Sequence, residues 1–109
     1  SLYRVIYVAN FILERLPNVR GVPEATRKEV TAEAKFLRAY AYFILTYTYG
    51  DVPQVTTTDQ ATNRNIGRTA RATILTSVLT DYQAALTDLP AAIISTSATG
   101  RRPSSWLLR

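Results

Sequence analysis

The segment from Glu33 to Pro53 constrains the fold of this chain most, because its apolar residues repeat with the period of a helix. Two rows of such residues run side by side: Phe36, Tyr40, Phe43 and Tyr47 form the first, and Leu37, Ala41, Ile44 and Thr48 the second. A helix that is apolar around most of its circumference must be covered on more than one side. We therefore expect the remaining segments to pack around this helix.

Proline and glycine mark the limits of the central helix, which we expect to span residues 23–49. Pro23 suits the first position of a helix, where no backbone N–H is needed. Gly50 can adopt the left-handed conformation that closes a helix, and Pro53 forces Val52 into an extended conformation. The central helix is thus longer than the average helix of a globular protein.

Two further helices are predicted, one before and one after the central helix. The first spans residues 2–16, with apolar positions at Leu2, Val5, Ile6, Ala9, Ile12, Leu13 and Leu16. The second spans residues 69–89, with Thr69 as its N-cap. Its apolar row is Leu75, Val78, Tyr82, Ala85 and Leu89, with Leu79 and Leu86 beside it. Residues 103–105 resemble the opening of a fourth helix near residue 104.

Residues 50–68 have no sustained period of either kind, so we expect a long irregular loop between the second and third helices. Val52 and Val55 could pair with a strand from outside this chain. The predicted fold class is all-α, with antiparallel helices and one long loop.

Composition excludes several kinds of chemistry. The 109 residues contain no cysteine and no histidine, so disulfides, thiolate metal ligands and the usual proton shuttle are not available. The net charge of +5 is spread over several segments and does not by itself indicate a nucleic-acid partner. The length allows at most one domain. No apolar run reaches the roughly 20 residues of a membrane span.

The acidic pair Glu29 and Glu33 lies on one helical face and could act as an acid/base or metal-binding pair. No third ligand or nucleophile accompanies it, so we interpret both as structural carboxylates and predict no catalytic residue, no metal site and no cofactor. Arg38 is expected to meet Glu33 or a neighbouring helix end in the interior. Asn10 either faces solvent, as most asparagines do, or makes a polar contact across a helix pair.

A basic set at Arg64, Arg68 and Arg71 is spaced like a helical stripe, and Arg101 and Arg102 add a cluster near the C-terminus. A glycine interrupts the first set, and no aromatic residue is interleaved with it. We interpret both sets as surface charge and predict no nucleic-acid partner.

Aromatic residues are the usual platforms for sugars, but most tyrosines here fall at helical spacing. Tyr40, Tyr47 and Tyr82 lie on the predicted apolar rows, so we expect them to pack against other helices. The pattern constrains a second set less: Tyr3, Tyr7, Tyr49 and Trp106. The sequence assigns no ligand-binding residue.

The central segment also resembles a known family. Glu33-Ala34-x-Phe36-Leu37-Arg38-Ala39-x-x-Tyr42-Phe43, followed by Gly50-Asp51-Val52-Pro53, is similar to a motif of the RagB/SusD family of outer-membrane lipoproteins that capture glycans at the surface of Bacteroidetes-type bacteria. Residues 3–16 and 81–90 are similar to the flanking segments. The spacing of Val78, Tyr82, Ala85 and Pro90 matches a tetratricopeptide helix, and the family has tetratricopeptide-like helical scaffolds.

This resemblance implies that residues 1–109 are a partial helical scaffold from the N-terminal part of a larger RagB/SusD-like protein. The implied function is capture of oligosaccharides or other nutrients and delivery to a TonB-dependent, SusC-like transporter, without catalysis. The implied location is the outer membrane, as a surface-exposed lipoprotein whose signal and anchor lie upstream.

Two other interpretations remain open. The chain could be a free-standing tetratricopeptide-like interaction module that holds a peptide in a groove, or a truncated remnant. In each case a two-sided central helix with only two full neighbours is expected to leave tyrosine and phenylalanine exposed, which would make the isolated chain marginally stable.

Overall fold

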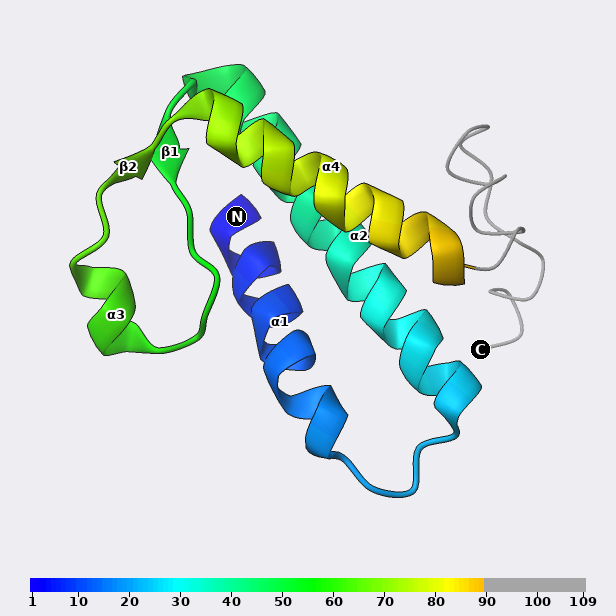
Figure 1. The fold of residues 1–109 in the computed structure, drawn as a ribbon. Coiled ribbons are helices and arrows are strands. Elements are labelled where there is room, and N and C mark those ends of the chain that lie inside the picture. The colour runs from blue at the N-terminus through cyan, green and yellow to red at the C-terminus, as the bar shows by residue number, and fades with distance from the viewer. Residues whose placement is uncertain (90–109) are drawn as a thin grey trace.

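The computed structural model describes residues 1–89. These form a mainly helical fold with three long helices and two very short strands (Figure 1). In chain order the elements are α1 (Leu2–Arg15), a 3-10 turn (Leu16–Asn18), α2 (Glu24–Tyr49), β1 (Val52–Pro53), α3 (Gln60–Arg64), β2 (Arg68–Thr69) and α4 (Arg71–Asp88). The all-α prediction is therefore confirmed. The fourth helix predicted near residue 104 lies outside the described residues.

Helix α2 is the centre of the fold, as its two apolar rows predicted. Helices α1 and α4 both lie along it, and each runs antiparallel to it (Figure 1). The main core lies where the three helices and β1 meet, and its larger side chains are Ile6, Tyr42, Leu45, Val52, Ile74 and Val78.

The buried face of α2 is not the one that the predicted aromatic row indicated. Four alanines on α2 are at most 2% exposed: Ala32, Ala34, Ala39 and Ala41. Small side chains allow the neighbouring helices to approach α2 closely, while the aromatic residues of the predicted row from Tyr40 onward face outward. Tyr40, Phe43 and Tyr47 are 50%, 44% and 73% exposed. The expectation that tyrosine and phenylalanine remain exposed on the central helix is thus confirmed.

The turn between α1 and α2 is held by a side chain of α2. The guanidinium group of Arg27 donates hydrogen bonds to the carbonyl oxygens of Leu16 and Val19. Arg27 also forms an ion pair with Glu24 at 3.6 Å. A single arginine therefore ties the carbonyl groups of the turn to the first turns of α2, whose N-cap residue, Pro23, makes no side-chain hydrogen bond.

The segment after α2 is more ordered than the predicted loop. Val52 pairs with Thr69 and Pro53 with Arg68 in a short antiparallel ladder, so the prediction that Val52 pairs with a strand from outside the chain is wrong. The sequence does not predict this pairing, because strands of two residues are too short to show an alternating apolar pattern. A one-turn helix, α3, lies between them, and the Asp59 side chain caps it by accepting from the backbone N–H of Thr62.

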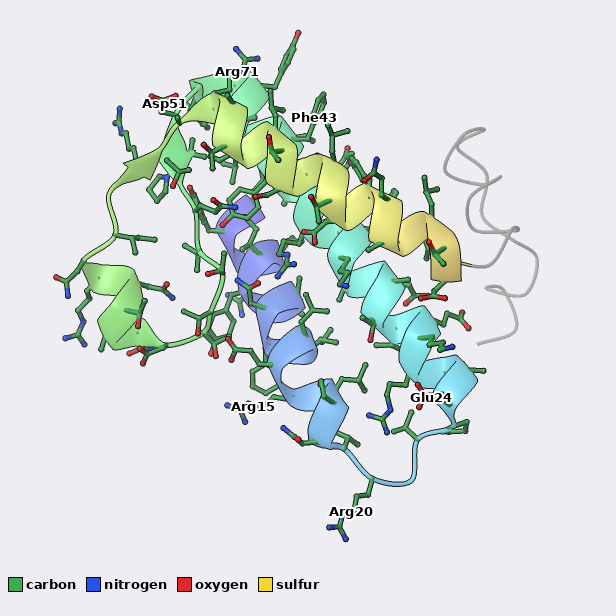
Figure 2. All side chains as sticks on the ribbon, in the orientation of Figure 1. Arg15, Arg20, Glu24, Phe43, Asp51 and Arg71 are labelled. Atoms are coloured by element: carbon green, nitrogen blue, oxygen red, sulfur yellow. The ribbon has the colours of Figure 1, made fainter. Side chains whose placement is uncertain are left out.

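The start of α4 is capped by a residue distant in sequence. Thr69 lies in β2 and is not the N-cap; Ala70 occupies that position without a side-chain hydrogen bond. Instead, Asp51 Oδ1 accepts from the backbone N–H of Arg71 at 2.9 Å, and the two residues lie at the same end of the molecule in Figure 2. The carboxylate also lies favourably near the positive end of the helix dipole.

Gly50 makes the turn into this segment possible. Its backbone has φ 78° and ψ −118°, a region that is accessible to glycine and strained for other residues. The positive φ agrees with the predicted helix end, although the ψ angle differs from that of a left-handed helical residue. No atom lies within 4 Å of a Cβ built at this position, so the demand for glycine is purely conformational.

We expect Gly50→Ala to lower the free energy of unfolding by about 1–3 kcal/mol, because alanine must adopt a strained backbone without any gain in packing. Urea unfolding followed by circular dichroism measures this loss. The matched control is Gly67→Ala, which also places a Cβ in open space but at a position without positive φ. An equal loss in both variants would show that backbone strain at Gly50 is not the cause.

A carboxylate on α1 fixes the loop between β1 and α3. The Glu14 side chain accepts hydrogen bonds from the backbone N–H and the hydroxyl of Thr58, at 2.8 and 2.6 Å. Hydrogen bonds from Thr58 hold the pKa of this exposed carboxyl below its ordinary value. The ionised form is therefore the one that holds the loop against α1.

This contact gives a pH dependence with a defined sign. Because the pKa of Glu14 is lower in the folded chain than in the unfolded chain, its contribution is complete above the ordinary carboxyl pKa of roughly 4 and is lost as pH falls through the lowered value. An NMR titration of the Thr58 amide shift is expected to show this transition. Glu14→Gln should abolish it, and a midpoint at or above the ordinary pKa would contradict the contact.

Candidate functional site

A polar cleft of about 250 Å³ lies between α2, α4 and the segment that follows β1. Its walls carry hydroxyl and amide groups from Gln54, Thr56, Thr76, Ser77 and Thr80. At its base are Arg38, Tyr42 and Asp81. Groups of these kinds can hydrogen-bond to the hydroxyls of a sugar, so the cleft is the first candidate for a binding site.

The base of the cleft is an ion pair between α2 and α4. The Arg38 guanidinium donates from Nε to Asp81 Oδ2 at 2.8 Å and from Nη2 to Asp81 Oδ1 at 2.9 Å. The two side chains are only 20% and 13% exposed. Two parallel hydrogen bonds between partly buried charges fix both distance and orientation, so this pair joins the two helices in one defined setting.

The remaining donor of Arg38 extends the network to α1 and the loop. Arg38 Nη1 donates to Asn10 Oδ1, and Asn10 Nδ2 donates to the carbonyl oxygen of Val55, both at 2.9 Å. Asn10 is 1% exposed. Of the two interpretations of Asn10, the contact across a helix pair is correct and the solvent-facing one is wrong. We name this arrangement of Asn10, Arg38, Asp81 and Val55 the polar network.

Tyr42 adds a second link to the same loop. Its hydroxyl donates to the carbonyl oxygen of Val55 at 2.9 Å and accepts from the Val55 backbone N–H. Burial raises the pKa of Tyr42 to about 12. The phenol therefore remains neutral near neutral pH and acts as a fixed hydrogen-bonding group.

Most polar groups on the cleft walls already have partners within the chain. Gln54 Nε2 donates to Ser77 Oγ at 2.8 Å, and the hydroxyls of Thr76 and Thr80 each donate to the carbonyl four residues earlier at 3.1 Å. The aromatic ring at the base, that of Tyr42, is only 3% exposed, so it offers no face for a sugar to stack on. The polar groups of the cleft thus mainly bond within the chain.

The structure places both acidic residues of the predicted pair on α2. Glu29 and Glu33 are both half-buried on α2, and Glu33 lines a different, apolar groove between α1 and α2. No group of three or more potential metal-ligating side chains occurs within residues 1–89.

The basic residues are spread over three elements and do not form a helical stripe. Arg64 ends α3, Arg68 lies in β2 and Arg71 begins α4, and all three are exposed. Arg101 and Arg102 lie outside the described residues. The three described arginines are consistent with surface charge.

The aromatic residues divide differently from the prediction. The prediction that Tyr40 and Tyr47 pack against other helices of this chain is wrong, since both are exposed. Tyr82 is half-buried, and the centre of its ring lies 5.4 Å from that of Phe36. Tyr7 and Tyr49 are 47% and 71% exposed. Tyr3 is half-buried, and its hydroxyl donates to the Pro53 carbonyl oxygen at 3.0 Å. Trp106 lies outside the described residues.

Sequence reasoning missed the role of Asp81. The Arg38 prediction named Glu33 or a helix end, and the structure gives Arg38 a bidentate partner in the middle of α4. A signal was present, because Asp81 lies directly beside the apolar row, three residues after Val78 and next to Tyr82. An acidic residue at that position is a candidate partner for the arginine on the facing helix.

We expect Asp81→Asn to lower the free energy of unfolding by about 3 kcal/mol, because the partly buried Arg38 charge loses its counterion. The matched control is Glu24→Gln, which removes a solvent-exposed carboxylate paired with Arg27 at 3.6 Å and should cost at most about 1 kcal/mol. Urea unfolding measures both. A similar small loss in the two variants would mean that the polar network contributes little to stability.

Comparison with known proteins identifies the family. A model of a SusD-like family, described as "Starch-binding associating with outer membrane", matches residues 1–106. A SusD-like protein of Formosa agariphila, P25, is 38% identical over 84 residues, which are 76% of this chain and 16% of that protein.

Solved structures agree. A laminarin-binding SusD-like protein superposes with a TM-score of 0.76 at 31% identity, over 82% of this chain and 19% of that protein. A SusD-like carbohydrate-binding protein from Bacteroides fragilis gives 0.71 at 31% identity, over 82% and 17%. The chain thus spans less than a fifth of the length of each of these relatives. With a family model covering nearly its whole length, this chain belongs to the SusD-like family.

Proposed function

We propose that this chain is part of the helical scaffold of a protein that captures oligosaccharides at the outer membrane. The proposal rests on the contacts made by residues of the family motif in segment 33–53. Arg38 binds Asp81 and Asn10, Gly50 makes the turn after α2, and Asp51 caps α4. These residues all hold elements of the fold together, as expected of a scaffold.

The proposed action on carbohydrate is non-covalent binding without bond cleavage. Support comes from the SusD-like family, whose relatives include a laminarin-binding protein and a carbohydrate-binding protein. The oligosaccharide itself would be held by the full-length protein. Within residues 1–89 most polar side chains of the cleft already have hydrogen-bond partners in the chain, which favours a ligand site in another part of the full-length protein.

The proposed partner is a TonB-dependent, SusC-like transporter, and the proposed location is the cell surface, through a lipid anchor outside this sequence. Support is the family description, which places related proteins in association with the outer membrane. Among the described helices, none is long and apolar enough to cross a membrane. The interpretation as a free-standing peptide-binding module is less favoured, since the matched relatives are more than five times longer than the matched segment.

Calorimetry with a panel of soluble oligosaccharides, including laminari- and malto-oligosaccharides, tests the proposal. We expect the full-length protein to bind at least one member of the panel and residues 1–109 alone to bind none. Full-length Tyr47→Ala, which removes an exposed ring of the scaffold, should bind as the unmodified protein does.

Either of two results would contradict the scaffold assignment. Binding by residues 1–109 alone would place a site on this chain, and the exposed aromatic rings would become its candidates. Absence of binding by the full-length protein to every oligosaccharide would remove the support for carbohydrate capture.

A further inference from the structure

An apolar groove with a volume of about 430 Å³ lies between α1 and α2. We name it the α1–α2 groove. Its apolar walls are formed by Val5, Val8, Ile12, Val30 and Leu37. Val8 and Leu37, on opposite walls, are 49% and 48% exposed. Aliphatic side chains that line a groove at this exposure are typical of a surface that another element covers.

The groove contrasts with the other flank of α1. There the segment from Pro53 to Thr58 covers the helix and is held by polar contacts from Tyr3, Asn10 and Glu14. Figure 1 shows this segment and α2 on opposite sides of α1. Helix α1 is therefore covered by α2 and by the loop, while Val5, Val8 and Ile12 face the groove.

The apolar positions of α1 extend beyond its contact with α2. Ile6 and Ala9 are buried in that contact, with exposures of 0% and 2%. Val5, Val8 and Ile12 widen the apolar face to a breadth that one neighbouring helix does not cover. The apolar face of α1 is thus wide enough to contact a further apolar element besides α2.

The length of the relatives indicates what this neighbour is. The 84 aligned residues make up 16% of the relative from Formosa agariphila, so most of such a protein lies outside the matched segment. Helix pairs of tetratricopeptide-like scaffolds cannot bury their apolar faces alone, and they stack on further helices of the same chain. Ser1, Arg4 and Glu33 also line the groove, but most of its lining is aliphatic. A mainly aliphatic lining resembles a permanent interface, which is more apolar than a transient one.

We propose that the α1–α2 groove is filled by a helix of the same polypeptide, from the part of the full-length protein outside residues 1–109. This inference rests on the proposed function only in that the chain is part of a larger scaffold. The occupying helix inserts apolar side chains one turn apart between Val8 and Leu37, in the manner of a helix in a groove. The groove is then an internal joint of the protein and is not a surface for the transporter.

Cysteine labelling of the full-length protein tests this directly. Residues 1–109 contain no cysteine, so each variant introduces one thiol into this segment, and the unsubstituted full-length protein gives the background labelling. Val8→Cys reports on the groove, and Leu37→Cys reports on its opposite wall. The matched control is Val19→Cys, at a residue of similar exposure, 44%, in the turn between α1 and α2. We expect maleimide to react with positions 8 and 37 at least about tenfold more slowly than with position 19, and at equal rates after unfolding in urea.

Each other outcome overturns the proposal. Equal rates at positions 8, 37 and 19 in the folded protein would show an open groove. Protection that disappears on dilution would identify a second copy as the occupant, and protection that requires added transporter would identify the transporter. A photo-crosslinker at position 8 adds a second readout: the expected product joins this position to a peptide of the same chain outside residues 1–109.

The test is independent of the proposed ligand. The labelled variants are checked for folding by circular dichroism, and oligosaccharide binding is measured on the same samples. Slow labelling without any oligosaccharide binding would leave the joint in place and overturn only the proposed function. Binding with rapid labelling at positions 8 and 37 would do the reverse.

Discussion

The bidentate ion pair between Arg38 and Asp81 is the contact on which the arrangement of the three long helices depends. A charged pair that is mostly withdrawn from water is stable only if its hydrogen bonds are satisfied, and here Asn10 accepts from the remaining guanidinium nitrogen. Because each bond has a preferred direction, the pair restricts how α4 and α1 can rotate or slide along α2. Apolar packing through small alanines would by itself allow several such settings.

The polar network also explains why the segment after β1 follows one path. The carbonyl oxygen of Val55 accepts from both Asn10 and Tyr42, and its N–H donates to Tyr42. The backbone N–H and carbonyl of Val55 are thereby satisfied by side chains, as a neighbouring strand would satisfy them. The loop is held against α1 and α2 for this reason, and several polar groups of the cleft beside it bond within the chain.

The sequence predicted those parts of the fold that depend on local periodicity and missed those that depend on distant partners. The three long helices follow from apolar spacing and from Gly50. The partners of Arg38, the cap that Asp51 provides for Arg71 and the pairing of Val52 with Thr69 join residues 17 to 43 positions apart, and a helical period carries no information on such pairs. Helical spacing predicts a buried row of Phe36, Tyr40, Phe43 and Tyr47, but only Phe36 packs against a core cluster. The buried face of α2 is rich in alanine instead, because small side chains allow close helix contact.

The polar contacts of α1 have a consequence for the order in which the chain can fold. Tyr3 bonds to a residue 50 positions later, Asn10 to one 45 positions later and Glu14 to one 44 positions later. Each of these bonds closes a loop that contains the whole of α2, whereas the contact between α1 and α2 needs only a short turn. A chain that emerges gradually from a ribosome or a translocation channel can thus form the first helical hairpin early. It completes the polar contacts of that hairpin only after the residues that follow α2 have emerged.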